Sequence, residues 1–388
     1  MSESTNAEKR YFALYTYHTN RSTGNDTSSI TDEHDNGVSE FLQREAMFNS
    51  DFSLSVITTN LEAEQETMLR GFIATRLSKG TVFSGIGDVT DFHLDEEKLQ
   101  CYYYHLRELN DEHVADSESS MYPSEEYVVC FLATAEDSLD LFRVDLDSYS
   151  EELLPMLDSE MKAVDKVQIY MSKWYEQAVQ YITRSIKKLS SQLSILLHET
   201  ISNSKVEIEC DDKVTELEIK RFMHCCSLSD LLLQANDRGS GHQDSSSEPS
   251  LIDFDEASSK VFDLKADKAV KMYIKEDTIT FDNSVENDFC KEWMNTLLDA
   301  CNSNPAYSRQ VIESYKLRVI QDMNLLKRLV RQAESDHYAL YRAFIFLKKC
   351  GNCAVLLKHT NVDCSAMSED ANHVLRILQE FVLQDIPA

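Results

Sequence analysis

A stripe of apolar residues at helical spacing runs through residues 306–335 and constrains this segment to one long amphipathic helix. The apolar side chains recur every three or four positions, which places them along one side of a helix. They are Ile312, Tyr315, Val319, Met323, Leu326, Val330 and Ala333. Pro305 suits the first turn of this helix, because the N–H that proline lacks would have no partner there.

Four basic residues border this stripe and form what we call the basic ridge. Their spacings of 7, 11 and 4 residues return to nearly the same helix face, and they are Arg309, Lys316, Lys327 and Arg331. The whole chain carries a formal charge of -29, so a cationic ridge beside an apolar stripe predicts a surface for an acidic or apolar protein partner. The alternative is an ordinary domain helix whose charges lie in solvent or pair with acids of the same chain, such as Glu313 and Glu334.

The balance of 67 acidic against 38 basic residues limits the partners of this chain. Nucleic acid and anionic lipid would both be repelled, so we expect no nucleic-acid binding, and we expect another protein to bring the chain to any membrane. No apolar run approaches the ~18 residues of a membrane span, and residues 1–12 lack the apolar core of a secretory signal. We therefore expect a cytoplasmic or peripheral protein whose ten cysteines are reduced thiols.

The order of the predicted elements indicates an α+β fold. After a polar tail at 1–10, we expect an α+β domain with an antiparallel sheet over 11–150, including a disordered loop at about 19–50. A helix is predicted from an N-cap at Asn60 to a left-handed end at Gly80. Strands are predicted at 11–17, 52–57, 89–94, 99–106 and 127–133, with a further candidate at 140–144. This order is similar to that of longin-type domains, a comparison that concerns the fold alone.

Helical periodicity replaces the strand pattern further along the chain. We predict a helical segment at 151–235, with a long or broken helix over 160–202. An acidic, serine-rich linker follows at 236–260, and a helical region extends over 261–388. Within this last region, helices are predicted near 285–302, 306–335, 337–350 and 368–384.

Cys350 and Cys353 form a CxxC motif. A thioredoxin-like site places its first cysteine at a helix N-terminus, where the dipole lowers the thiol pKa. Cys350 instead ends a predicted helix, with Gly351 as its cap, and the negative partial charge there raises the thiol pKa. A zinc site would need further ligands such as His359 and Cys364, in a spacing that no familiar zinc module uses. We therefore predict neither site, and a thiol- or zinc-dependent protein is kept as the alternative function.

Other short motifs carry no chemistry that the sequence supports. Adjacent residues of a helix point about 100° apart, so the run His224, Cys225 and Cys226 favours buried thiols over a shared metal. Gly85 and Gly87 follow a predicted helix and precede a strand, the reverse of a dinucleotide-binding loop. No P-loop, HExxH or GxSxG motif occurs. We predict no catalytic residue, cofactor site or metal site.

Residues 251–255 match the clathrin-box pattern, which has apolar residues at its first, second and fourth positions and an acid at its end. The five residues are Leu251, Ile252, Asp253, Phe254 and Asp255. A segment without fixed structure can add its backbone to a propeller groove while its apolar side chains fill pockets. The pattern is short, and an acidic chain contains such matches by chance, so clathrin binding stays a hypothesis.

Several collinear blocks span most of the chain. They are residues 51–55 with 69–87, residues 126–132 with 141–143, residues 289–294 (FCKEWM) and residues 309–339. These blocks resemble the Njmu-R proteins, an animal family first linked to spermatogenesis. Long collinear blocks make chance a poor explanation of this resemblance.

The resemblance implies a non-enzymatic subunit of a trans-Golgi assembly. Its implied partners are a WD-repeat propeller protein, a large scaffold subunit and, indirectly, a TBC-domain protein that bridges to golgins. The assembly helps golgins capture endosome-derived vesicles made with a clathrin adaptor. The implied location is the cytoplasmic surface of the trans-Golgi network and of cytoplasmic vesicles. The resemblance carries over no catalytic residue.

Overall fold

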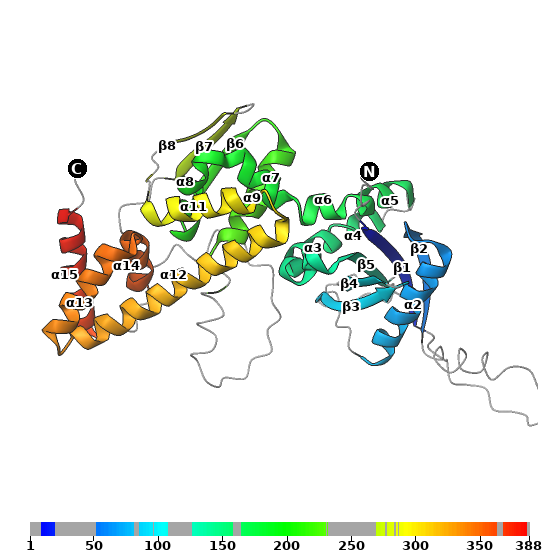
Figure 1. Cartoon of the computed structure of the whole chain (residues 1–388), viewed down its shortest axis with the longest axis horizontal. Helices are drawn as coiled ribbons and strands as arrows, with labels where there is room; N and C mark the ends of the chain where they lie inside the picture. The colour runs from blue at the N-terminus through cyan, green and yellow to red at the C-terminus, as the bar shows by residue number, and fades with distance from the viewer. Residues whose placement is uncertain are drawn as a thin grey trace, which may run out of the picture. The chain divides into compact units, whose positions relative to one another are not determined.

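The chain folds into two compact units, residues 1–180 and 181–388 (Figure 1). The computed structural model describes residues 9–19, 52–80, 85–95, 97–107, 126–157, 164–229, 231, 269–275, 278–282, 285, 287–362 and 368–385. The sequence analysis placed the end of the first domain at residue 150. The division after residue 180 places the helices between these two positions in the same unit as the five-stranded sheet. The fold is α+β, as predicted from the order of the elements.

The first unit is built on a five-stranded antiparallel sheet with the order β2-β1-β5-β4-β3. The strands are β1 (Tyr11–Thr19), β2 (Phe52–Thr59), β3 (Asp88–Leu94), β4 (Glu97–Arg107) and β5 (Glu126–Thr134). All four neighbouring pairs are antiparallel. Strand β5 lies at the centre, and every residue between its two ends is buried, which fits its continuous apolar run.

Helices cover both faces of this sheet. Leu69 and Ile73 of helix α2 (Ala63–Ser78) pack into a core with Tyr103 of β4 and Val128 of β5. Neighbouring side chains on a strand point to opposite faces, so the next residues of these strands form a second core. Its centre is Phe131, whose ring lies 5.8 Å from Tyr102 and 4.9 Å from Trp174 between ring centroids. Trp174 belongs to helix α6 (Trp174–Ala178).

Two local predictions for this unit are wrong. Helix α2 takes Glu62 as its N-cap, because the side chain of Asn60 is held elsewhere. The Asn60 side chain accepts the N–H of Phe12 at 2.7 Å and donates to the carbonyl of Arg10 at 3.0 Å. The candidate strand at 140–144 is a short 3-10 helix, η2 (Leu139–Phe142), followed by α3 (Arg143–Glu151).

The first unit also contains η1 (Ala135–Asp137), α4 (Leu154–Leu157) and α5 (Val164–Ser172). The helices η2 and α3 form in place of the candidate strand at 140–144, where Leu139, Phe142 and Leu146 are buried at helical spacing. Of the two predictions for 160–202, a long helix or a broken one, the broken form is found, with α5, α6, α7 (Tyr181–Leu189), η3 (Ser190–Gln192) and α8 (Leu193–Ile201).

The second unit combines helices with a small sheet that the sequence analysis missed. Besides α7 and α8, the described part of this unit contains the helices α9 (Lys213–Cys226), α11 (Asp288–Ala300), α12 (Pro305–Ala333), α13 (His337–Cys350), α14 (Cys353–Val362) and α15 (Glu369–Asp385). The sheet has the order β6-β7-β8, with strands β6 (Val206–Cys210), β7 (Val270–Lys275) and β8 (Thr278–Asp282). Strands β6 and β7 are parallel, and β7 and β8 are antiparallel. The C-terminal region is helical, as predicted, and these three strands are additions that the prediction did not include.

None of the helices in the described part of the chain has both the length and the apolar character that a membrane crossing requires.

Gly87 offers a direct test of the packing in the first unit. A Cβ atom at this position would lie well inside van der Waals contact with Asp147 and the Tyr102 ring. We expect Gly87→Ala to lower the free energy of unfolding by about 1–3 kcal/mol, because a filled core accepts an added methyl only with strain. Urea denaturation of the purified chain measures this change.

Gly71→Ala is the matched control for this variant. Gly71 lies within α2, with nothing within 4 Å of the position of an added Cβ. Alanine favours a helix interior over glycine by about 1 kcal/mol, so this control should retain or gain stability. Equal stability of the two variants would contradict the close packing at Gly87.

Candidate protein-binding surface

Helix α12 forms as its sequence predicts. The Asn304 side chain caps its first turn by accepting the N–H of Tyr307 at 2.7 Å, and Pro305 occupies the first turn. The predicted apolar stripe is buried at all positions except Tyr315, which is half-buried and stacks on Trp293 of α11 with 5.2 Å between ring centroids. The stripe therefore belongs to the core of the second unit.

The structure divides the basic ridge into an interior half and an outer half. Arg309 and Lys316 are only 9% and 6% exposed, which corrects their prediction as members of an exposed ridge. The Lys316 Nζ donates to the carbonyl oxygen of Cys225 at 3.1 Å, and Arg309 donates to the Cys225 thiol. Both cations also lie near Glu313, at 3.3 and 3.5 Å.

The end of α9 explains why these two cations are inside. Cys225 belongs to the last turn of α9, where backbone carbonyls have no partner within the helix. Positive charge is favoured at this end of a helix dipole. Lys316 therefore satisfies a carbonyl at the C-terminus of α9, while the contacts of both cations with Glu313 are the kind that the sequence analysis kept as its alternative.

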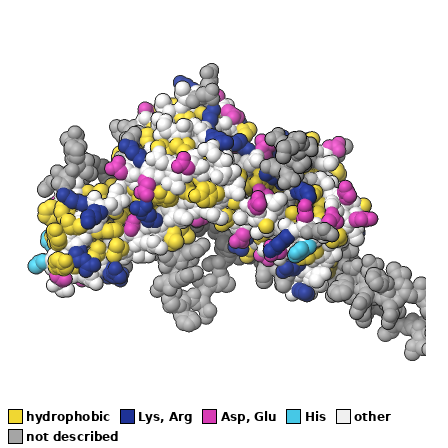
Figure 2. All heavy atoms as spheres, viewed as in Figure 1, with side chains coloured by type: hydrophobic (Ala, Val, Ile, Leu, Met, Phe, Trp, Pro, Cys, Tyr) yellow, Lys and Arg dark blue, Asp and Glu magenta, His cyan; other side chains and the backbone are white. Residues whose placement is uncertain are grey.

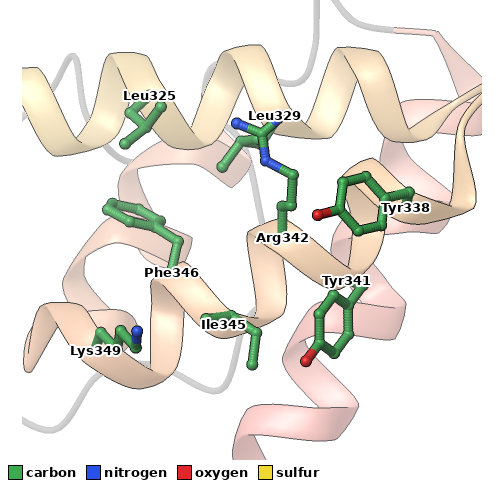
Figure 3. Close-up of a pocket in the computed structure, with 8 residues that line it drawn as sticks. All are labelled: Leu325, Leu329, Tyr338, Tyr341, Arg342, Ile345, Phe346 and Lys349. Carbon is green, nitrogen blue, oxygen red and sulfur yellow. The ribbon is translucent and has the colours of Figure 1, made fainter.

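A groove lies between α12 and α13, and neither Lys327 nor Arg331, the outer half of the ridge, lines it. Lys327 is half-buried and Arg331 is exposed. The groove has a volume of about 530 Å³ (Figure 3). Leu325 and Leu329 of α12 line one side, and the lining from α13 consists of Tyr338, Tyr341, Arg342, Ile345, Phe346 and Lys349.

Local sequence positions α13 beside α12. The Asp336 side chain caps the new helix by accepting the N–H of Tyr338 at 2.8 Å. The buried residues of α13 are Ala339, Ala343 and Leu347, at intervals of four, and the two alanines allow a close approach to neighbouring helices. Tyr338, Tyr341, Ile345 and Phe346 lie on the opposite side of α13, at the groove. Gly351 caps the helix, as predicted, and its φ of 66° is in the left-handed region.

Two tyrosines at the groove are unusually exposed. Tyr338 is 66% exposed and Tyr341 is 57% exposed, and their ring centroids lie 6.4 Å apart. Large aromatic side chains in solvent mark a surface that a partner can cover, because tyrosine and arginine are enriched at the centres of protein interfaces. The sequence analysis did not single out these tyrosines.

The groove is cationic although the chain is strongly acidic. Residues 325–349 contain six Lys and Arg against two Asp and Glu, a net charge of +4 in a chain of net charge -29. Helix α13 contains no acidic residue. Figure 2 shows Lys and Arg gathered beside apolar side chains over the α12 and α13 end of the second unit.

Comparison with known proteins now gives the family. The model of the Njmu-R1-like protein family matches residues 12–384. The chain belongs to this family. It is 36% identical over 379 residues to a mouse protein named Protein Njmu-R1, covering 96% of this chain and 90% of that protein. No solved structure matches the chain. The family match confirms the resemblance seen in the collinear sequence blocks and includes both units and the groove.

The CxxC motif of this Njmu-R1-like chain lies at the junction of α13 and α14. Burial raises the pKa of the Cys350 thiol to about 11. The direction agrees with the prediction, but the main cause is desolvation, whereas the prediction relied on the helix end. His359 is buried, and its Nε2 lies 2.6 Å from the carbonyl oxygen of Ile201. Cys364 lies outside the described residues, within which no cluster of three metal-ligating side chains occurs.

The remaining sequence predictions have different outcomes. Cys225 and Cys226 are buried, as expected, while His224 is exposed, and burial raises the pKa of Cys226. The clathrin-box residues 251–255 and the linker 236–260 lie outside the described residues, as do the tail at 1–8 and the loop at 20–51. Those predictions stay untested.

The two halves of the basic ridge should respond differently to charge reversal. We expect Lys316→Glu to lower the free energy of unfolding by about 3 kcal/mol or more, because it places an anion against the Cys225 carbonyl. Arg331→Glu should change stability by less than about 0.5 kcal/mol, because its side chain is exposed. Thermal and urea unfolding of both variants measure the difference. Equal losses would contradict the division of the ridge.

The raised pKa of Cys350 predicts slow reaction with alkylating reagents at neutral pH. The thiolate is the reactive form, and a group with a pKa of about 11 is almost wholly protonated at pH 7. Labelling of Cys350 by iodoacetamide should accelerate as the pH rises through 9 to 11. Peptide mass spectrometry follows it, with the urea-unfolded chain as the reference. Labelling at pH 7 as fast as in the unfolded chain would contradict burial of this thiol.

Proposed function

We propose that this chain is a non-enzymatic subunit of a trans-Golgi complex that acts through protein–protein contacts. In this role it helps golgins capture endosome-derived vesicles that are generated with a clathrin adaptor. The proposed partners are a WD-repeat propeller protein and a large scaffold subunit of the same complex, with a TBC-domain golgin-bridging protein as an indirect partner. The chain would act in the cytoplasm, peripherally at the trans-Golgi network and vesicles, with a further role in spermatogenesis.

The groove between α12 and α13 is the observation that carries a binding role. Two exposed tyrosines and a lining of Leu, Ile and Phe side chains provide apolar area, and Arg342 and Lys349 provide charge at the same place. This combination is typical of the buried centre of a protein interface. The match of the family model over residues 12–384 supports the specific complex, because the sequence resemblance implies that assembly.

The alternative of a thiol-dependent enzyme has less support. A catalytic cysteine needs a lowered pKa, so that the thiolate is populated at neutral pH. Burial shifts the pKa of Cys350 in the opposite direction, to about 11. Cys350, whose CxxC motif suggested this alternative, therefore has the raised pKa expected of a structural thiol.

Affinity purification of the full chain tests the proposed function. The tagged chain, expressed in cells that lack the endogenous copy, should recover the propeller and scaffold subunits in amounts comparable to its own. Quantitative mass spectrometry measures the ratio, and a tagged unrelated acidic protein is the control. Removal of the chain from these cells should slow the arrival of endosome-derived vesicles at the trans-Golgi network. A folded chain that recovers neither subunit would overturn the proposal.

A further inference from the structure

We propose that the groove between α12 and α13 binds an acidic, amphipathic α-helix of a partner protein. This inference rests on the proposed function only in assuming a protein partner, and it adds the chemistry and shape of the bound segment. The argument uses the lining of the groove, its exposed aromatic pair and the placement of its charges.

The shape of the groove suits a helix. Its lining comes from two helices packed against each other, and the Phe346 ring of α13 points toward Leu325 of α12 (Figure 3). A third helix that lays its apolar side chains over such a pair repeats the packing of side-chain ridges into grooves found within helical domains. Recognition of an amphipathic helix in an apolar groove is a common mode of protein binding.

The exposed tyrosines supply anchoring area beside this apolar lining. Tyr338 and Tyr341 are three positions apart in the sequence, so they lie on one face of α13. Both line the groove. A bound helix would cover their rings, which are more than half exposed in the chain alone. Their hydroxyl groups would still meet polar atoms at the edge of the contact.

The charges specify an acidic occupant. Arg342 and Lys349 are exposed, line the groove and are seven residues apart, which is about two helical turns or 10 Å along α13. An occupant with Asp or Glu at matching positions would pair with both cations. The absence of any acid from α13 means that a basic occupant would find no compensating charge on this helix.

A protein helix fits this surface better than an anionic membrane does. The apolar lining is concave, whereas a bilayer surface is approached by a protruding apolar face. The chain carries a net charge of -29, so an anionic membrane would repel most of the molecule. A local net charge of +4 over residues 325–349 is sufficient for pairing with one acidic helix.

Direct binding of a synthetic probe tests the proposal on the full chain. The probe is a fluorescent peptide of about 18 residues, or five helical turns, with Leu at i, i+3, i+4 and i+7 spacing and Glu on its flanks. Fluorescence anisotropy should show saturable binding that weakens as salt is raised, because the charge pairs lie near solvent. A peptide of the same composition in scrambled order, and one with Lys in place of Glu, should bind at least tenfold more weakly.

Two double variants assign this binding to the groove. Tyr338→Ala with Tyr341→Ala, and Arg342→Glu with Lys349→Glu, should each weaken probe binding about tenfold or more. The matched controls are Tyr307→Ala with Leu317→Ala, two exposed apolar residues of α12 outside the groove, and Lys79→Glu with Lys205→Glu. Both controls should bind like the unchanged chain. Circular dichroism should show the same helical content in all four.

A photo-crosslinking amino acid in place of Tyr341 identifies the natural occupant in the purified complex. A crosslink to an acidic helix of the propeller or scaffold subunit supports the proposal. A crosslink to residues 236–260 of the same chain would overturn it. Binding of the chain to phosphatidylserine vesicles without the peptide would also overturn it, if the groove variants abolish that binding. Recovery of both subunits without probe binding or a subunit crosslink would refute the groove and leave the proposed function standing. If the unchanged chain recovers neither subunit in the affinity purification, the proposed function is refuted instead.

Discussion

Burial of the apolar face of α12 is the constraint on which the second unit depends. Helices α7, α9, α11, α13, α14 and α15 all contact this one helix. Its 29 residues extend over about 43 Å, so it can serve as a common support for segments far apart in the sequence. Each buried Leu, Ile, Val or Met on it contributes roughly 1.5–3 kcal/mol relative to exposure.

Polar contacts then determine which basic side chains of α12 are buried. Arg309 and Lys316 turn toward the C-terminal end of α9, where the carbonyl of Cys225 lacks a helical partner. A buried cation requires a polar or charged partner, so these two side chains make their contacts inside the folded chain and not with a partner protein. Further along α12, Lys327 is half-buried and Arg331 is exposed, and the cations that line the groove, Arg342 and Lys349, belong to α13.

Sequence patterns predicted the larger elements and missed those that depend on distant partners. The strand β6 has the alternating sequence VEIEC, which carries a strand signal, but it lies between two helical stretches and pairs with β7 across more than 60 intervening residues of sequence. Asn60 is a good helix cap by type, yet it is held by the backbone of Phe12 in β1. In both cases a partner remote in sequence overrides a local preference.

The sequence by itself determined the length and buried face of α12, its start at Asn304 and Pro305, and the end of α13 at Gly351. These features follow from helical period and from backbone conformations that only certain residues adopt. Only the tertiary structure decided which members of the basic ridge are buried. Helical period places Lys316 and Lys327 on nearly the same face, and they differ because the end of α9, 91 residues from Lys316 in sequence, lies beside one and not the other. The exposure of Tyr338 and Tyr341 was likewise settled by packing, because the small residues Ala339 and Ala343 bring the opposite side of α13 into the core.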